Sequence, residues 1–202
     1  MTTPTRWYPD PAYRDDVHPG DPTSVRELDG LTVRKITVSA MNNCVYLLTC
    51  AATGEKLLID AADDVDRLTG LVAEGSGRLD LVVTTHQHWD HTRALAVLLQ
   101  RHPAPSAAGE DDADALPVPP TVRLRHGDVV TVGRARLDVI ALRGHTPGSV
   151  ALAYAEPGNR THLFTGDSLF PGGVGNTTMP GQSFSSLYAD VVERVFDRFG
   201  DN

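Results

Sequence analysis

The stretch Leu81-Val82-Val83-Thr84-Thr85-His86-Gln87-His88-Trp89-Asp90-His91 decides the fold, because apolar and β-branched residues run directly into polar ones. Branched side chains pack well on a pleated surface, so residues 82–85 are predicted to form a short buried strand. His86 and His88 are two residues apart, so in an extended backbone both imidazoles leave on the same side. We expect the chain to turn there into a helix over residues 92–101.

Four side chains that can bind a metal lie in this turn: His86, His88, Asp90 and His91. A single histidine after a strand is usually structural. Three histidines and an aspartate within six residues, directly after an apolar strand, are hard to explain in that way. Imidazole nitrogen and carboxylate oxygen suit a hard-to-borderline divalent cation, so the stretch predicts a metal site at a strand-to-helix turn.

Length and charge limit the classes of partner. The chain has 202 residues, enough for one domain with a proper core, and a formal net charge of −8. An acidic protein lacks the cationic surface that tracks phosphates, so we expect no nucleic-acid partner. No apolar run approaches the ~18 residues of a membrane span, and the first seven residues lack the apolar core of a secretory signal. We therefore expect a cytoplasmic protein that acts on a small molecule, with no membrane partner.

Residues 1–24 are predicted to be an extended arm, because they contain Pro4, Pro9, Pro11, Pro19 and Pro22. The rest, residues 25–202, is predicted to form one domain. Its β-rich segments are 25–28, 31–39, 43–50, 56–60, 122–124, 129–132, 136–142, 149–155 and 161–165. Cys44 and Cys50 lie in one of these strands, about 20 Å apart at ~3.3 Å per residue, which is too far for a disulfide.

Helices are expected over residues 63–73 and 184–199. The second would carry an apolar stripe of Phe184, Leu187, Tyr188, Val191, Val195 and Phe199. Residues 103–120, rich in alanine, proline and acids, are predicted to be an exposed excursion with one short helix near 110–116. Residues 172–175, Gly-Gly-Val-Gly, lack the ending of a phosphate-binding loop and are predicted to be a flexible loop.

Polar residues also stand at the ends of other predicted strands. His145 lies in Gly144-His145-Thr146-Pro147-Gly148-Ser149, and Asp167 in Gly166-Asp167-Ser168-Leu169-Phe170. Asp60 ends a third strand, where support of the metal site and a turn or capping role are both open.

The spacing H-x-H-x-D-H resembles the signature of the metallo-β-lactamase superfamily, and the resemblance extends over residues 33–199. The segment 166–170 looks most like the glyoxalase II branch. The resemblance implies an α+β fold, a four-layer αββα sandwich with the site along one edge. It also implies two divalent metal ions, with zinc as the first expectation and iron or manganese as alternatives. By this resemblance one metal is held by His86, His88 and His145, and a second by Asp90 and His91, with Asp167 bridging the two.

The activity implied is hydrolysis of a small thioester, ester or lactone by a metal-bound hydroxide. A bound cation can lower the pKa of water from 15.7 to about 7, which makes a serine or cysteine nucleophile unnecessary. Asp90 would orient the hydroxide, and a metal would stabilise the developing oxyanion. Neither cysteine has an obvious histidine base beside it in the sequence.

Two departures from the family pattern leave alternatives open. No histidine follows His162, so the histidine that this branch usually supplies after the last helix is missing. We therefore expect the chain to be C-terminally incomplete, without the last strand and helix of the fold. No Lys or Arg lies between Arg160 and Arg194, so a glutathione carboxylate loses an obvious partner.

The alternatives are a mononuclear iron dioxygenase acting on a persulfide and a truncated, non-catalytic domain that binds metal weakly. For the dioxygenase, His86, His145 and Asp167 would suffice to hold one iron.

Overall fold

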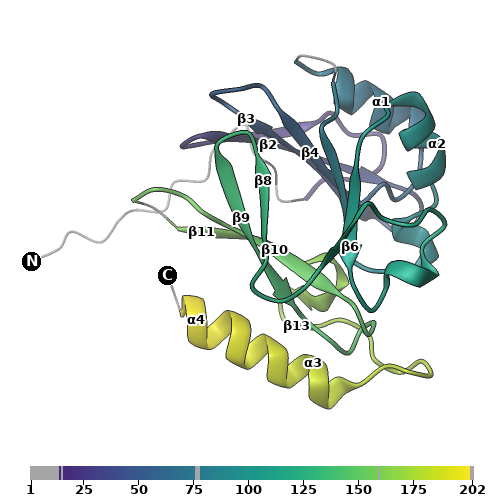
Figure 1. Ribbon diagram of the computed structural model, residues 1–202, viewed down its shortest axis with the longest axis vertical. Helices are drawn as coiled ribbons and strands as arrows, with labels where there is room; N and C mark the ends of the chain where they lie inside the picture. The colour runs from purple at the N-terminus through teal and green to yellow at the C-terminus, as the bar shows by residue number, and fades with distance from the viewer. Residues whose placement is uncertain (1–13, 15, 76–77, 159, 201–202) are drawn as a thin grey trace, which may run out of the picture.

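Two β-sheets packed face to face, with helices on both outer sides, form the body of the molecule (Figure 1). The computed structural model describes residues 14, 16–75, 78–158 and 160–200. Most of the predicted arm, residues 1–24, lies outside these residues. In its described part, the Arg14 backbone N–H donates to Ser24 Oγ at 2.7 Å and Val17 is buried.

The first sheet has seven strands in the order of the sequence. They are β1 (Ser24–Leu28), β2 (Leu31–Val38), β3 (Asn43–Cys50), β4 (Lys56–Ile59), β5 (Leu81–Thr84), β6 (Ser106–Gly109) and β7 (Val122–Leu124). Strands β1 to β4 pair antiparallel, whereas β4 to β7 pair parallel. Both faces of the central strands are covered, so Leu58 and Val82 face one core while Ile59 and Val83 face the other.

The second sheet has four antiparallel strands in the order β11-β10-β9-β8. Their bounds are β8 (Val129–Val132), β9 (Ala135–Ala141), β10 (Val150–Ala155) and β11 (Thr161–Phe164). Side chains alternate along β10, so Val150 and Leu152 face the first sheet while Ala151 and Ala153 face outward, toward a helix. The main core therefore lies between the two sheets.

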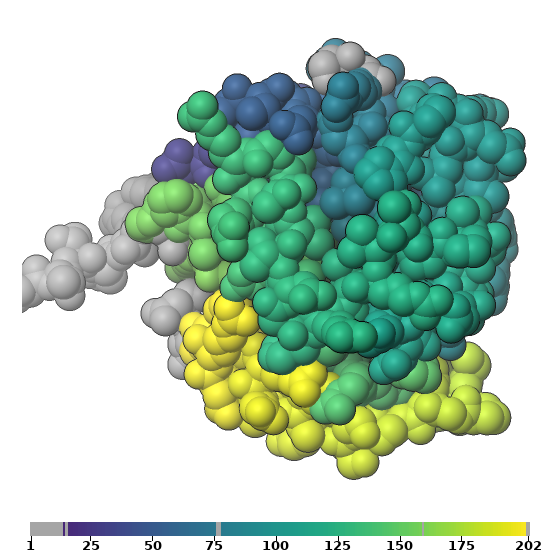
Figure 2. Space-filling view, viewed as in Figure 1, coloured from purple at the N-terminus to yellow at the C-terminus, as the bar shows by residue number. Residues whose placement is uncertain are grey.

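Helices form the two outer layers. The helices α1 (Val65–Ala73) and α2 (Leu95–Arg101) cover the seven-stranded sheet. The helix α3 (Phe184–Val191) continues through a π-helical segment, Val192–Phe196, into α4 (Asp197–Phe199), and it covers the four-stranded sheet. Figure 2 shows this last segment in yellow along the lower surface of the body. The predicted four-layer αββα sandwich is confirmed. Among the described residues, no helix is both long and apolar enough to cross a lipid bilayer.

The predicted apolar stripe of the last helix is wrong in part. Leu187, Val191 and Val195, each four residues apart, are buried against β9 and β10. Phe184 and Tyr188 are instead 58% and 56% exposed and stack on each other. The sheet covers only one narrow side of the helix, so apolar residues beside that side remain at the surface.

Two loop predictions are also wrong. Residues 103–120 contain the buried strand β6, and the expected helix near 110–116 is only a 3₁₀ turn, Ala113–Ala115. The sequence Ser-Ala-Ala-Gly of β6 has no β-branched residue, so its intrinsic strand propensity is low. The segment is a strand because it pairs in parallel with β5 and β7. Residues 172–175 are not an open loop, because β12 (Leu169–Phe170) pairs there with β13 (Gly173–Val174). Both cysteines are free, as predicted.

An ion pair between the buried Asp190 and the half-exposed Arg143 fixes α3 to the loop after β9. Asp190 is buried, and it accepts hydrogen bonds from the backbone N–H of Arg143 at 2.9 Å and from its guanidinium at 2.8 and 2.7 Å. Arg194 lies 3.3 Å from the same carboxylate. Burial alone would raise the pKa of Asp190, but the hydrogen bonds from Arg143 outweigh it and hold this pKa below its usual value.

We predict that Asp190→Asn lowers the free energy of unfolding at neutral pH by about 1–3 kcal/mol, because a charge-assisted hydrogen-bond set is lost while Arg143 remains half exposed. A carboxylate with a depressed folded pKa stabilises the protein above its unfolded pKa of about 3.9, and this stabilisation is lost as the pH falls through the folded pKa. The difference between wild type and variant should therefore shrink below about pH 4.

Urea unfolding of both proteins at several pH values, under the same metal conditions, measures this difference. Asp197→Asn removes an exposed carboxylate of the same helical segment and is the matched control. A difference that is absent at neutral pH, or that grows toward acid, would contradict the assignment.

Candidate metal centre

The parallel strands place several polar residues at one edge of the sandwich. Because β4, β5 and β6 run in the same direction, their carboxyl ends meet, and they are followed by Asp60, His86 and Asp112. The second sheet brings His145, between β9 and β10, and Asp167, after β11, to the same edge. The Val150 backbone N–H donates to Thr85 O at 2.9 Å and joins the two sheets at this point.

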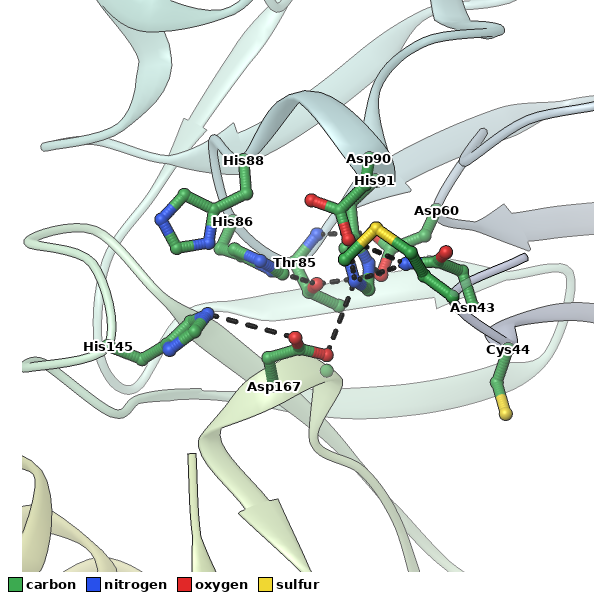
Figure 3. A network of polar contacts seen from close by, with 12 residues as sticks. Asn43, Cys44, Asp60, Thr85, His86, His88, Asp90, His91, His145 and Asp167 are labelled. Atoms are coloured by element: carbon green, nitrogen blue, oxygen red, sulfur yellow. Dashed lines mark hydrogen bonds and ion pairs between the residues drawn. The ribbon is translucent and has the colours of Figure 1, made fainter. Parts of the chain in front are cut away.

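Three imidazoles converge at this edge (Figure 3). One ligand atom from each of His86, His88 and His145 lies within 4.8 Å of the others. The ring centroids are 4.6–4.9 Å apart, and the rings meet edge to face. Two nitrogens bound to one zinc ion are at most about 4.2 Å apart, so only small adjustments are needed to share an ion.

The hydrogen bonding of these rings fits a metal. Within the part of the chain that the structure describes, Nε2 of His86 and Nε2 of His145 are buried without a hydrogen-bond partner. The other ring nitrogen, Nδ1, is hydrogen-bonded in both residues: to Thr85 Oγ1 at 3.0 Å in His86 and to the Asn176 carbonyl oxygen at 2.7 Å in His145. Histidine ligands are commonly oriented in this way. Burial, followed by the neighbouring imidazoles, lowers the pKa of His86 well below its usual value and keeps it neutral, as ligation requires.

His91 lies beside this group, its ring 4.2 Å from that of His86. Its Nδ1 is 2.9 Å from Asp60 Oδ2, and its Nε2 is 3.2 Å from Asp167 Oδ1 and 3.8 Å from Asp90 Oδ2. Burial alone would lower the pKa of His91, but the hydrogen bonds to Asp167 and Asp60 outweigh it and raise this pKa to about 10. A cation bound at Nε2 must therefore displace a proton.

Asp60 supports the site instead of merely ending a strand. Its Oδ1 accepts from the Thr85 backbone N–H at 2.7 Å, and its Oδ2 accepts from Thr85 Oγ1 at 2.7 Å as well as contacting His91. The residue is buried, with a left-handed φ of 61°. A residue stays in such an unfavourable backbone conformation only when several contacts hold it there. For Asp60 these are the contacts to Thr85 and His91.

Asp167 stands between the two groups of histidines. Its Oδ2 is 3.8 Å from His145 Nε2, while its Oδ1 faces His91. Gly166 brings it there, because this residue has a φ of 50° and a Cβ would lie 2.5 Å from Thr85 Oγ1. One carboxylate oxygen faces each half of the site, which is an arrangement compatible with a bridging ligand.

All six residues predicted as ligands lie at this edge: His86, His88, Asp90, His91, His145 and Asp167. Two further polar residues contact the site and were not predicted from the sequence. Asn43 donates from Nδ2 to Asp90 Oδ2 at 2.9 Å and lies 3.0 Å from His91 Nε2. Asp112 contacts the loops of His86 and His145. Asn43 could have been identified because it is a polar residue at the start of an apolar strand. Asp112 could not, because it lies in an acidic stretch after a strand that the sequence did not predict.

Comparison with known sequences agrees with this geometry. Residues 40–199 match the metallo-beta-lactamase superfamily. The chain is 34% identical over 148 residues to the hydroxyacylglutathione hydrolase of Thermosynechococcus vestitus, covering 72% of this chain and 57% of that protein. It is 34% identical over 160 residues to the enzyme of the same name from Fuscovulum blasticum, covering 78% and 61%. The chain thus spans about three fifths of the length of these relatives.

Solved structures show the same fold. ETHE1 from Myxococcus xanthus superposes with a TM-score of 0.71 and 33% identity, over 82% of this chain and 70% of that one. TTHA1623 in a di-iron-bound form superposes with a TM-score of 0.67 and 27% identity, over 81% and 85%. With its sandwich, its histidine cluster and this match over most of its length, the chain belongs to the metallo-β-lactamase superfamily.

Proposed function

We propose that this chain is a two-metal hydrolase that cleaves a small thioester, with esters and lactones as related substrates. The observation that carries the proposal is the position of Asp167, with one oxygen toward His145 and the other toward His91. Two adjacent ligand groups that share a carboxylate suit a pair of divalent cations. The relatives named hydroxyacylglutathione hydrolase support the thioester class.

His86, His88 and His145 would hold one ion, and Asp90 and His91 a second, with Asp167 between them. Zinc suits these nitrogen and oxygen donors, and iron or manganese is the alternative. When bound, the metal supplies a water acidified from pKa 15.7 to about 7 and positive charge near the carbonyl oxygen.

The chain's own residues prepare the reaction. In thioester hydrolysis the water oxygen bonds to the carbonyl carbon, the carbon–sulfur bond breaks, and a carboxylic acid and a thiol leave. Asp90 is buried, and its Oδ2 already accepts from Asn43. We therefore assign to its Oδ1 the orientation of the attacking water. Positioned acid–base groups of this kind typically contribute about 10²–10⁴-fold to a rate.

The sequence bears on the leaving group. It has no Lys or Arg between Arg160 and Arg194, the region in which the glyoxalase II branch carries a basic residue. We therefore propose a small thioester without committing to glutathione as the thiol.

One observation favours a second candidate, a mononuclear iron dioxygenase acting on a persulfide. His145 Nε2 and Asp167 Oδ2 are 3.8 Å apart, and His145 lies in the same imidazole cluster as His86. TTHA1623, 27% identical, is described in a di-iron-bound form, which supports iron as a metal for this fold but not a one-iron site. A non-catalytic domain that binds metal weakly is the third possibility.

Elemental analysis of protein purified without chelators should separate these candidates. We predict two zinc ions per chain and hydrolysis of short acyl thioesters, followed by release of free thiol with a thiol-reactive dye. Zinc removed by dialysis against a chelator should abolish the thiol release, and re-added zinc should restore it. One iron per chain, with oxygen consumption on adding a persulfide and no thioester cleavage, would establish the dioxygenase instead. Absence of bound metal would favour the non-catalytic domain.

A second prediction separates the two aspartates. Asp167→Ala should reduce the metal content, because the carboxylate placed between the two histidine groups is removed. Asp90→Asn keeps the shape but not the charge, so it should lower kcat by about 10²–10⁴-fold while the first metal stays bound. Metal content and kcat are measured on the same preparations. Equal loss of both metals in the two variants would show that the roles are divided wrongly.

A further inference from the structure

We propose that Asp112 is a positioning residue that sets the distance between the metal-binding histidines of the two sheets. It does so by clamping the loop of His86 and His88 to the loop of His145. The inference rests on the proposed metal site but not on which reaction that site performs.

The contacts of Asp112 reach both loops. The residue follows β6 and is completely buried. Its Oδ2 accepts from the Gln87 backbone N–H at 2.9 Å and from Thr146 Oγ1 at 2.6 Å, and its Oδ1 accepts from the Gly148 backbone N–H at 2.7 Å. Gln87 lies between His86 and His88, and Thr146 directly follows His145. One carboxylate therefore ties together ligand loops that start from different sheets.

The backbone packing at the same place is independent evidence that the His145 loop and the turn of Asp112 are in close contact. A Cβ at Gly109, the last residue of β6, would lie 1.9 Å from the carbonyl oxygen of Gly148. A Cβ at Gly148 would lie 2.3 Å from the backbone nitrogen of Asp112. No other residue type fits at either position without moving the backbone, so glycine allows the His145 loop to sit directly on the turn that carries Asp112.

A buried carboxylate is unfavourable unless its oxygens are hydrogen-bonded, and here the donors belong to the two ligand loops. The carboxylate is therefore satisfied only when both loops are docked. In that state the rings of His88 and His145 are 4.6 Å apart and those of His86 and His145 are 4.9 Å apart. Residues that orient metal ligands from outside typically change metal affinity by about 10–100-fold when they are removed.

Asp112→Asn is the direct test. Whichever way the amide is turned, its NH₂ group faces a backbone N–H, of Gln87 or of Gly148. Two donors then oppose each other, so the hydrogen bond to one of the two loops is lost. We predict that zinc binds the variant about 10–100-fold more weakly than the wild type, measured by competition with a chromophoric chelator. The visible absorption of the cobalt(II)-substituted variant should also shift, because the ligand geometry is relaxed. Glu110→Gln, which changes a partly buried acid that lies two residues away and pairs with Arg125, should retain wild-type affinity and spectrum.

A second pair of variants covers the case in which Asp112→Asn does not fold. Thr146→Val removes one donor to Asp112 and should weaken zinc binding several-fold, whereas Thr146→Ser keeps the hydroxyl and should bind as the wild type does. Circular dichroism in the presence of chelator confirms that each variant is folded.

Wild-type zinc affinity and an unchanged cobalt spectrum in folded Asp112→Asn would overturn the inference, as would wild-type affinity in Thr146→Val. If the wild type hydrolyses thioesters and these variants bind zinc normally, only this inference fails. If the wild type binds no zinc, the inference and the proposed function fail together.

Discussion

The parallel pairing of β4, β5 and β6 is the constraint on which the rest of the structure depends. It brings three carboxyl strand ends to one edge, and with them Asp60, His86 and Asp112. The second sheet packs against the first so that β10 begins beside the end of β5, joined by the hydrogen bond from Val150 to Thr85. The core between the sheets therefore does more than stabilise the fold, because it sets the distance from which His145 and Asp167 approach.

Around this edge, three of the predicted ligands are oriented by a partner that lies on the side away from the centre. Thr85 holds His86, Asp60 holds His91, and the carbonyl of Asn176 holds His145. The Nε2 atoms of His86 and His145 are left without a hydrogen-bond partner among the described residues, although burial of such atoms is unfavourable. A cation bound there would compensate this cost, which is a physical reason for a buried polar cluster at the end of an apolar sandwich.

The prediction from sequence was most successful where the signal was local. Strands such as β3 and β9 can be recognised from their apolar and branched residues, and the predicted ligands follow strand ends within a few positions. The prediction failed where tertiary contacts determine the local structure. The small residues of β6 have no strand propensity of their own, so Asp112 could not be placed after a strand. Phe184 and Tyr188 fit the helical periodicity of the apolar stripe, but this periodicity does not show how wide a face of the helix the sheet covers.

The central claim is that the imidazoles of His86, His88 and His145 bind one metal ion and that Asp167 links it to a second. Anomalous diffraction at the zinc absorption edge, from crystals grown with zinc, tests it most directly. We expect one peak about 2 Å from a ring nitrogen of each of the three histidines and a second near His91, with Asp167 between them. Peaks elsewhere on the surface, with none among these side chains, would contradict it.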